Sequence, residues 1–246
     1  MAASDLVETL RECGALAEAL QLGIETLPIV RRMYGDEHED TLRAISRLAS
    51  VHAGMEDYAA ALPLETAVLA VRRRVSGNDD EGRLCAMNIL SVIHRNMRNY
   101  AAALPLAQEA LNSKRRTRGS DHISAIISMG TLADVHSDMG NHDLALPLNR
   151  DALEICRLLF GSLHPDTHER AGDLGVLSFN MGDNDAAAPL LREAVQGLAA
   201  VYNAEHQHVH KFQGVLNDLT EGSEAESEEQ EETMYQRMAK RPRRRE

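Results

Sequence analysis

Residues 38–77 contain two stretches of helical periodicity separated by a short polar corner. In the first stretch, hydrophobic residues recur at spacings of three and four, which places Leu42 and Ile45 on one stripe of a helix. A corner at residues 55–57 follows, and the same kind of pattern resumes from about Tyr58 to Val75. The pattern predicts a helical hairpin in which each helix buries one apolar face.

The hairpin pattern recurs along the chain with a period of 42 residues. Three residue types share this period, namely Gly35, Gly77, Gly119 and Gly161, then Pro63, Pro105, Pro147 and Pro189, then Leu48, Leu90, Leu132, Leu174 and Leu216. A fixed period of this size is typical of a solenoid, in which stacked units share a continuous core. We therefore expect an all-α solenoid, which offers an extended binding surface.

The ends of the helices carry residues suited to capping. Asp40 and Thr41 suit the start of a first helix, and Asp57, Asn99, Asn141 and Asp183 suit the start of second helices. Gly140 and Gly182, at the corners, suit a left-handed end of a first helix, as does the 42-residue glycine series at the ends of second helices. The four repeated prolines lie inside second helices, where we expect them to bend the helix and set the curvature of the solenoid.

The repeat register divides the chain into a solenoid and a tail. Residues 15–33 match a second helix that lacks most of its first, and residues 206–219 match a first helix. We predict a solenoid at residues 1–219, with four full 42-residue repeats and partial repeats at both ends. Residues 220–246 are polar, first acidic and then basic, and we expect this tail to be disordered.

Composition narrows the classes of function. The net charge of −12 argues against a nucleic-acid groove on the solenoid. The three cysteines share no repeat position and no short spacing, so we interpret them as reduced thiols of an intracellular protein. The start of the chain lacks the pattern of a signal peptide, and no stretch reaches the about 18–20 apolar residues that span a bilayer, so we expect no membrane partner.

These residues resemble the tetratricopeptide repeat, and the 42-residue period resembles its kinesin-light-chain-like subclass. The resemblance covers about residues 15–219 and depends on Leu48-Ala49, on Ala61-Leu62-Pro63-Leu64, and on Arg31-Arg32 before Gly35 and His38. It implies a right-handed superhelical solenoid that acts as a non-catalytic protein–protein interaction adaptor or scaffold.

The chain departs from that subclass in two ways. No long heptad coiled coil precedes the repeats, so we do not expect the kinesin heavy chain as a partner. The family often carries an Asn pair before the Leu-Ala step, which helps to bind a peptide backbone, and only Asn88 remains of it here.

The resemblance implies that the first helices line a concave groove. We predict that peptide-binding residues lie there, and that an amide such as Asn88 serves both a backbone donor and an acceptor. The candidates are Arg43, Asn88, Arg95, Asn96, Asp134, Asp138 and Asn180. The alternative is that these residues form a merely solvated helix face. Because acidic residues gather toward the C-terminal repeats, we expect a protein or peptide partner of basic or mixed charge.

The 11 histidines suggest a metal site, but their repeat spacing favours structural hydrogen bonding. His38, His122, His164 and His206 share one repeat position, and His52, His94 and His136 share another. His206 and His210 lie on one helix face, without a third ligand nearby. We predict no metal and no cofactor, and the absence of a phosphate loop or nucleophile motif predicts that the chain is not an enzyme.

The basic end of the tail resembles a nuclear import signal. Its residues are Lys240, Arg241, Arg243, Arg244 and Arg245. We expect a cytoplasmic adaptor, and the alternative is a nuclear regulatory scaffold that uses the acidic run and this basic cluster. A tail that is merely solvated, with its acidic run masking its basic run, is a further alternative.

Overall fold

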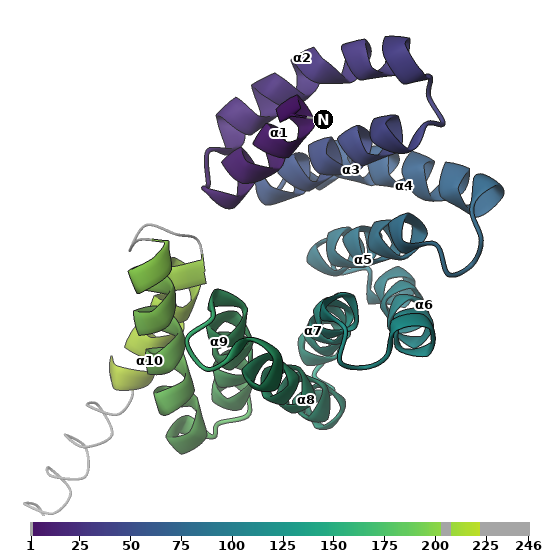
Figure 1. Ribbon diagram of the computed structural model, residues 1–246. Coiled ribbons are helices and arrows are strands. Elements are labelled where there is room, and N and C mark those ends of the chain that lie inside the picture. The colour runs from purple at the N-terminus through teal and green to yellow at the C-terminus, as the bar shows by residue number, and fades with distance from the viewer. Residues whose placement is uncertain (1, 203–207, 222–246) are drawn as a thin grey trace, which may run out of the picture.

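The computed structural model describes residues 2–202 and 208–221. Within these ranges, every secondary-structure element is a helix. They form hairpins, each with a first and a second helix (Figure 1). The first helices are α1 (Ala2–Glu12), α3 (Glu39–Gly54), α5 (Glu81–Asn96), α7 (Ile123–Asp138) and α9 (Pro165–Asn180). The second helices are α2 (Leu16–Tyr34), α4 (Tyr58–Val75), α6 (Tyr100–Arg118), α8 (His142–Phe160) and α10 (Asn184–Val201). Residues 208–221 form a further helix at the position of a first helix.

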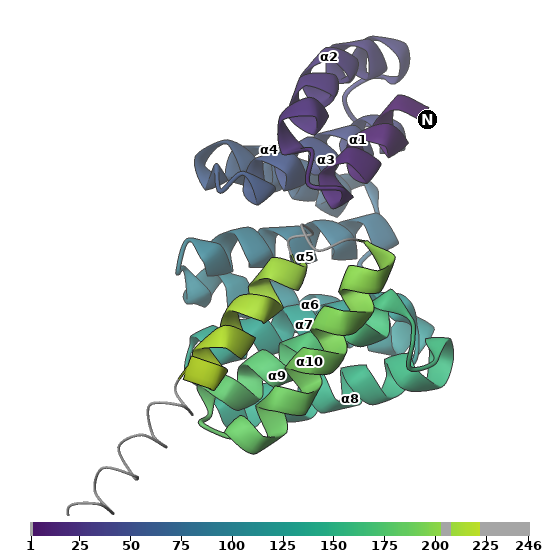
Figure 2. The same cartoon turned by 90° about the vertical axis from the view of Figure 1, so that its left-hand side faces the viewer.

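The stacking of the hairpins defines an inner and an outer face. Each first helix packs closely on the next first helix, whereas second helices are farther apart and meet through long side chains, as Arg157 of α8 and Glu193 of α10 do. The first helices therefore lie closer together and form the inner wall of the curve, as α5 and α7 do in Figure 1. Figure 2 views the molecule from that open side. The all-α solenoid expected from the 42-residue period is confirmed.

The N-terminal hairpin contains more of its first helix than the sequence pattern indicated. Helix α1 has 11 residues, whereas α3 has 16, and it contacts both α2 and α3. Val7 of α1 is 2% exposed because it packs against Ala19 and Val51. Helix α1 thus completes this hairpin with a shortened first helix.

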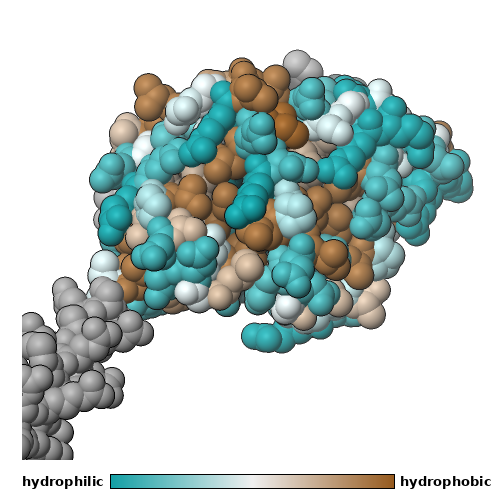
Figure 3. All heavy atoms as spheres, turned by 90° about the horizontal axis from the view of Figure 1, so that it is seen from below, coloured by the Kyte–Doolittle hydropathy of each residue, from teal (hydrophilic) through white to brown (hydrophobic). Residues whose placement is uncertain are grey.

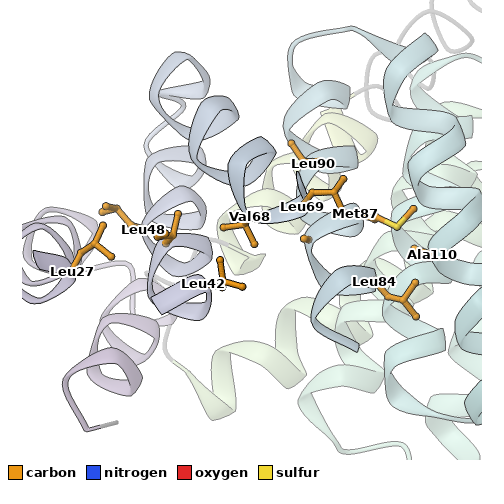
Figure 4. Packing of buried hydrophobic residues seen from close by; sticks show 11 residues of the cluster. Leu27, Leu42, Leu48, Val68, Leu69, Leu84, Met87, Leu90 and Ala110 are labelled. Carbon is orange, nitrogen blue, oxygen red and sulfur yellow. The ribbon is translucent and has the colours of Figure 1, made fainter. Parts of the chain in front are cut away.

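The repeated leucines form the centre of the core. Leu48, Leu90, Leu132 and Leu174 are all buried, and one cluster of buried residues runs from Leu27 in α2 to Ala110 in α6 (Figure 4). Each hairpin packs apolar side chains against its neighbours, so no single hairpin contains a complete hydrophobic core.

Where neighbouring first helices touch, the side chains at the contact match each other in size. The residue at one repeat position packs on the residue 40 positions earlier, as Ser128 does on Asn88. At the next two interfaces the earlier residue is a glycine, and a Cβ atom there would lie 2.3 Å from Arg170 or from Phe212. Gly130 and Gly172 thus make room for larger side chains on the next helix.

The histidines at the hairpin junctions are helix caps. The Nδ1 atoms of His38, His122 and His164 accept hydrogen bonds from the backbone N–H two residues later, at 3.2, 3.1 and 3.2 Å. Asp80 holds the same position before α5 and accepts from the N–H of Arg83 at 2.8 Å. The structural interpretation of this histidine series is therefore confirmed for its described members, whereas His206 lies outside the described residues.

Two expectations about helix ends were wrong. The cap of α3 is His38 rather than Asp40 or Thr41, and Thr41 is completely buried. Gly77 does not adopt a left-handed conformation, because α4 ends at Val75 and Ser76 continues in an extended conformation. At the starts of the second helices, the side chains of Asp57 and Asp183 accept a backbone hydrogen bond, whereas those of Asn99 and Asn141 do not.

The repeated prolines lie inside second helices as expected, and their effect on curvature stays a prediction.

The corner inside each hairpin requires one residue with a left-handed backbone. Gly14, Gly140 and Gly182 take this position with φ of 79°, 77° and 78°, and Glu56 and Arg98 take it with φ of 61° and 58°. Glycine adopts this conformation without strain, whereas other residues lose about 1–2 kcal/mol.

We therefore expect Gly182→Ala to lower the free energy of unfolding by about 1 kcal/mol, although a Cβ there meets nothing within 4 Å. The matched control is Glu56→Ala, which should leave the stability of the corner nearly unchanged because Glu56 already bears the strain. Urea unfolding followed by circular dichroism measures both, and equal effects of the two substitutions would contradict the expectation.

None of the described helices is long and apolar enough to cross a membrane.

Candidate functional site

Four of the predicted groove residues come together between α5 and α7. Arg95 Nη1 forms an ion pair with Asp134, and its Nε lies 3.4 Å from Oδ2 of Asp138. Both Nε and Nη2 of Arg95 also donate to Oδ1 of Asn96, at 3.4 and 3.3 Å. Arg95 therefore holds together a polar cluster on the inner wall.

Arg95 also borders three hollows, one at the corners of the hairpins and two between first helices. The largest, about 440 Å³, is bounded by the half-buried rings of Tyr58 and Tyr100 and by Arg98. The other two measure about 150 and 250 Å³ and continue toward α9 and the helix at residues 208–221. Figure 3, a view from below Figure 1, shows hydrophobic side chains interspersed with hydrophilic ones.

The remaining predicted residues lie apart from this cluster or serve the fold. Asn180 is exposed at the end of α9 and borders the 150 Å³ cavity. Arg43 borders a different hollow of about 490 Å³ between α1, α3 and α5, together with Ser46 and Cys85. Asn88 is only 7% exposed, and its Nδ2 donates to Oγ of Ser128 at 2.8 Å. The Asn88 amide thus joins α5 to α7 through one of its two N–H groups, and its contact with a peptide backbone stays a prediction.

The acidic side chains of the C-terminal repeats have cationic partners that the sequence analysis missed. Asp173 lies 3.0 Å from Arg170 and 3.1 Å from Lys211, while Glu169 lies 3.4 Å from Arg170 and 2.9 Å from Nδ1 of His208. Burial alone would raise the pKa of Asp173, but the two cations outweigh it and hold this pKa below its usual value. The groove is therefore less acidic than the carboxylates alone indicated.

A sequence signal for these pairs exists. Arg95 and Asp134 lie 39 residues apart, and Asp173 and Lys211 lie 38 apart, slightly less than one repeat. Neighbouring first helices place such positions side by side, so opposite charges at this separation predict ion pairs across the inner wall.

A buried carboxyl group lies beside the hollow of about 490 Å³ that Arg43 borders. Glu65 in α4 is completely buried, and its Oε1 accepts a hydrogen bond from Oγ of Ser46 at 3.1 Å. No hydrogen-bond partner for its Oε2 lies among the residues that the structure describes. Burial is the main cause that raises the pKa of Glu65 to about 7, against the opposing effects of Ser46 and Arg72.

The histidines in the packed stripe do not converge. His52 Nδ1 lies 3.1 Å from Asp57, whereas burial lowers the pKa of His94 and of His136. Within residues 2–202 and 208–221, no group of three His, Cys, Asp or Glu side chains is arranged to hold a metal ion.

The sequence pattern of the tetratricopeptide repeat family matches residues 1–74, 82–157 and 129–200. The chain belongs to this family, whose members generally mediate protein–protein interactions and whose fold is typically a non-enzymatic scaffold. No curated protein matches the chain significantly.

Several solved structures are similar to the chain. The TPR-like repeats of a kinesin light chain from Podosopora anserina have 20% identity and a TM-score of 0.63, covering 81% of this chain and 94% of theirs. BtubC (BKLC) from P. vanneervenii has 16% identity and a TM-score of 0.65, covering 94% and 96%. A Rap protein, solved in complex with Competence and Sporulation Factor, has 11% identity and a TM-score of 0.73, covering 91% and 63%. At these identities the similarity shows the shared fold, including that of kinesin-light-chain-like repeats.

Proposed function

We propose that this chain is a non-catalytic adaptor that binds a peptide segment of a protein partner along the inner face of its first helices. The observation that carries the proposal is the row of three hollows joined by Arg95. A groove made from several helices suits an extended segment, because successive side chains of the segment can each enter a separate hollow.

The charges of the inner wall favour a partner segment of basic or mixed charge. Asp134, Asp138, Glu169 and Asp173 lie there with three permanent cations, Arg95, Arg170 and Lys211. One negative charge is left over when His208 is neutral, so an added cation improves the balance. The rings of Tyr58 and Tyr100 supply apolar contact area, of the kind found at the centres of protein interfaces.

Affinity capture with a groove variant tests the proposal. Asn96→Ala, Asp138→Asn and Asn180→Ala together change exposed residues of the inner wall. Arg73→Ala, at an exposed position of α4, is the matched control. Partners captured by wild type and by the control but lost from the groove variant, at unchanged circular dichroism and melting temperature, support the proposal. Partners retained by all three proteins contradict it.

We propose the cytoplasm as the site of this activity, with a nuclear scaffold as the alternative. The basic cluster that favours import lies outside the described residues, so the interpretation of Lys240, Arg241, Arg243, Arg244 and Arg245 stays a prediction.

If this cluster directs import, substituting Lys240, Arg241 and Arg243 with Ala should move a fluorescent fusion from the nucleus to the cytoplasm, because receptors read clustered positive charge. Imaging of the two fusions in cells measures this. An unchanged cytoplasmic signal would exclude the nuclear alternative, and a fusion with Arg31→Ala and Arg32→Ala controls for loss of basic charge elsewhere.

A further inference from the structure

The smallest of the three hollows has the features of a specific pocket. This cavity of about 150 Å³ lies where α5, α7, α8, α9 and the helix at residues 208–221 meet. Val176 and Leu177 give it an apolar wall, and Asp134, Asp138 and Ser137 place oxygen atoms around it. It therefore combines a short apolar passage with several hydrogen-bond acceptors.

Asn149 of α8 contributes an acceptor that is not used within the described residues. Its side chain lines the cavity, is 3% exposed, and its Oδ1 has no hydrogen-bond partner. Burying a carbonyl oxygen without a hydrogen-bond donor costs free energy. A ligand that donates a hydrogen bond to this oxygen would remove that cost. The equivalent positions in the neighbouring second helices hold Ala107 and Leu191, so the fold does not need an amide here.

The cationic side chains around the cavity, Arg95 and Lys211, are engaged with carboxylates. Arg95 is paired with Asp134 and Asp138, and Lys211 is paired with Asp173. Although Asp138 is exposed to solvent on one side, its partial burial is the main cause that raises its pKa, against the opposing charge of Arg95. A further cation would stabilise the ionised form of Asp138 and supply the donor that Asn149 lacks.

We propose that this cavity binds the side chain of a lysine from the partner segment. Its methylene groups lie along Val176 and Leu177, and its ammonium group donates to Oδ1 of Asn149 and to Asp138. The proposal rests on the peptide-binding function proposed above and names the residue that anchors the segment. A lysine fits because it joins an apolar stem to a compact cation with three donors.

Nuclear magnetic resonance titration of the full chain with short peptides tests the pocket. One probe is an acetylated, amidated Gly-Ser-Lys-Ser-Gly, and the other carries norleucine in place of lysine, which keeps the stem and removes the charge. We expect the lysine peptide to shift the side-chain amide signal of Asn149 and to bind roughly tenfold more tightly than the norleucine peptide. Equal binding of the two peptides, or no shift of the Asn149 signal, would overturn the proposal.

Variants taken from the neighbouring repeats complete the test. Asn149→Leu, which introduces the residue of position 191, should weaken the lysine peptide by roughly tenfold without affecting the norleucine peptide. Asn149→Ala, which introduces the residue of position 107, provides a second variant if the leucine disturbs the fold. Retention of lysine-dependent binding in a folded variant contradicts the pocket. If Asn149→Leu keeps partners that the groove variant loses, the pocket is wrong while the groove proposal stands.

Discussion

Replacing Glu65 with glutamine should stabilise the protein by about 3 kcal/mol at about pH 8. The pKa of the buried carboxyl is raised from 4.5 to about 7, and each unit of difference corresponds to about 1.4 kcal/mol. Glutamine keeps an oxygen for the hydroxyl of Ser46, which donates to Glu65 at 3.1 Å, and removes the buried charge. The gain is large because the carboxylate is shielded from solvent and finds no second hydrogen-bond partner in the described part of the chain.

The sign of the pH dependence follows from the raised pKa. Between pH 4.5 and about 7 the folded protein retains a proton on Glu65 that the unfolded chain has lost, so the free energy of unfolding falls as pH rises. The contribution of Glu65 to the free energy of unfolding is fully present below pH 4.5 and is lost as the pH rises through about 7.

Thermal and urea unfolding of both proteins across this range measure the effect. The difference between wild type and Glu65→Gln should vanish in acid and grow toward neutral pH. Glu154→Gln, at an exposed position of α8, is the matched control and should change little at any pH. Parallel pH profiles of wild type and Glu65→Gln would show that the carboxyl group is not buried as described.

Replacing Phe212 with alanine should release the helix at residues 208–221 from the solenoid. The Phe212 ring is 1% exposed and occupies the space left by Gly172, where a Cβ atom would lie 2.3 Å from it. Loss of a buried phenylalanine costs about 3–5 kcal/mol, and at an end unit this loss falls on the local contacts. We expect amide hydrogen exchange in that helix to become at least about a hundredfold faster.

Phe160→Ala is the matched control for this change. The Phe160 ring is 38% exposed and stacks on His164 at 4.7 Å between ring centroids, so its removal should leave exchange in residues 208–221 unaltered. Unchanged exchange in Phe212→Ala would mean that the ion pairs of Glu169 with His208 and of Asp173 with Lys211 hold the helix without the ring.

Much of the fold could be predicted because its determinants are local and repeat. Helices follow from the spacing of apolar residues, and the corners follow from Gly140 and Gly182, whose left-handed conformation is a property of a single residue. Once one hairpin is recognised, the period of 42 residues places the others. The resemblance to tetratricopeptide repeats placed Arg95, Asn96, Asp134 and Asp138 on the inner helices, and the structure brings these four residues together.

The sequence by itself determined which elements form and in what order. Only the tertiary structure decided which polar groups remain available. It joined Asn88 to Ser128, paired Asp173 with Lys211, buried Glu65, and left the oxygen of Asn149 without a donor. The physical reason is that a period specifies positions along a helix, whereas burial and pairing depend on the size and charge of side chains that other helices bring within a few ångströms.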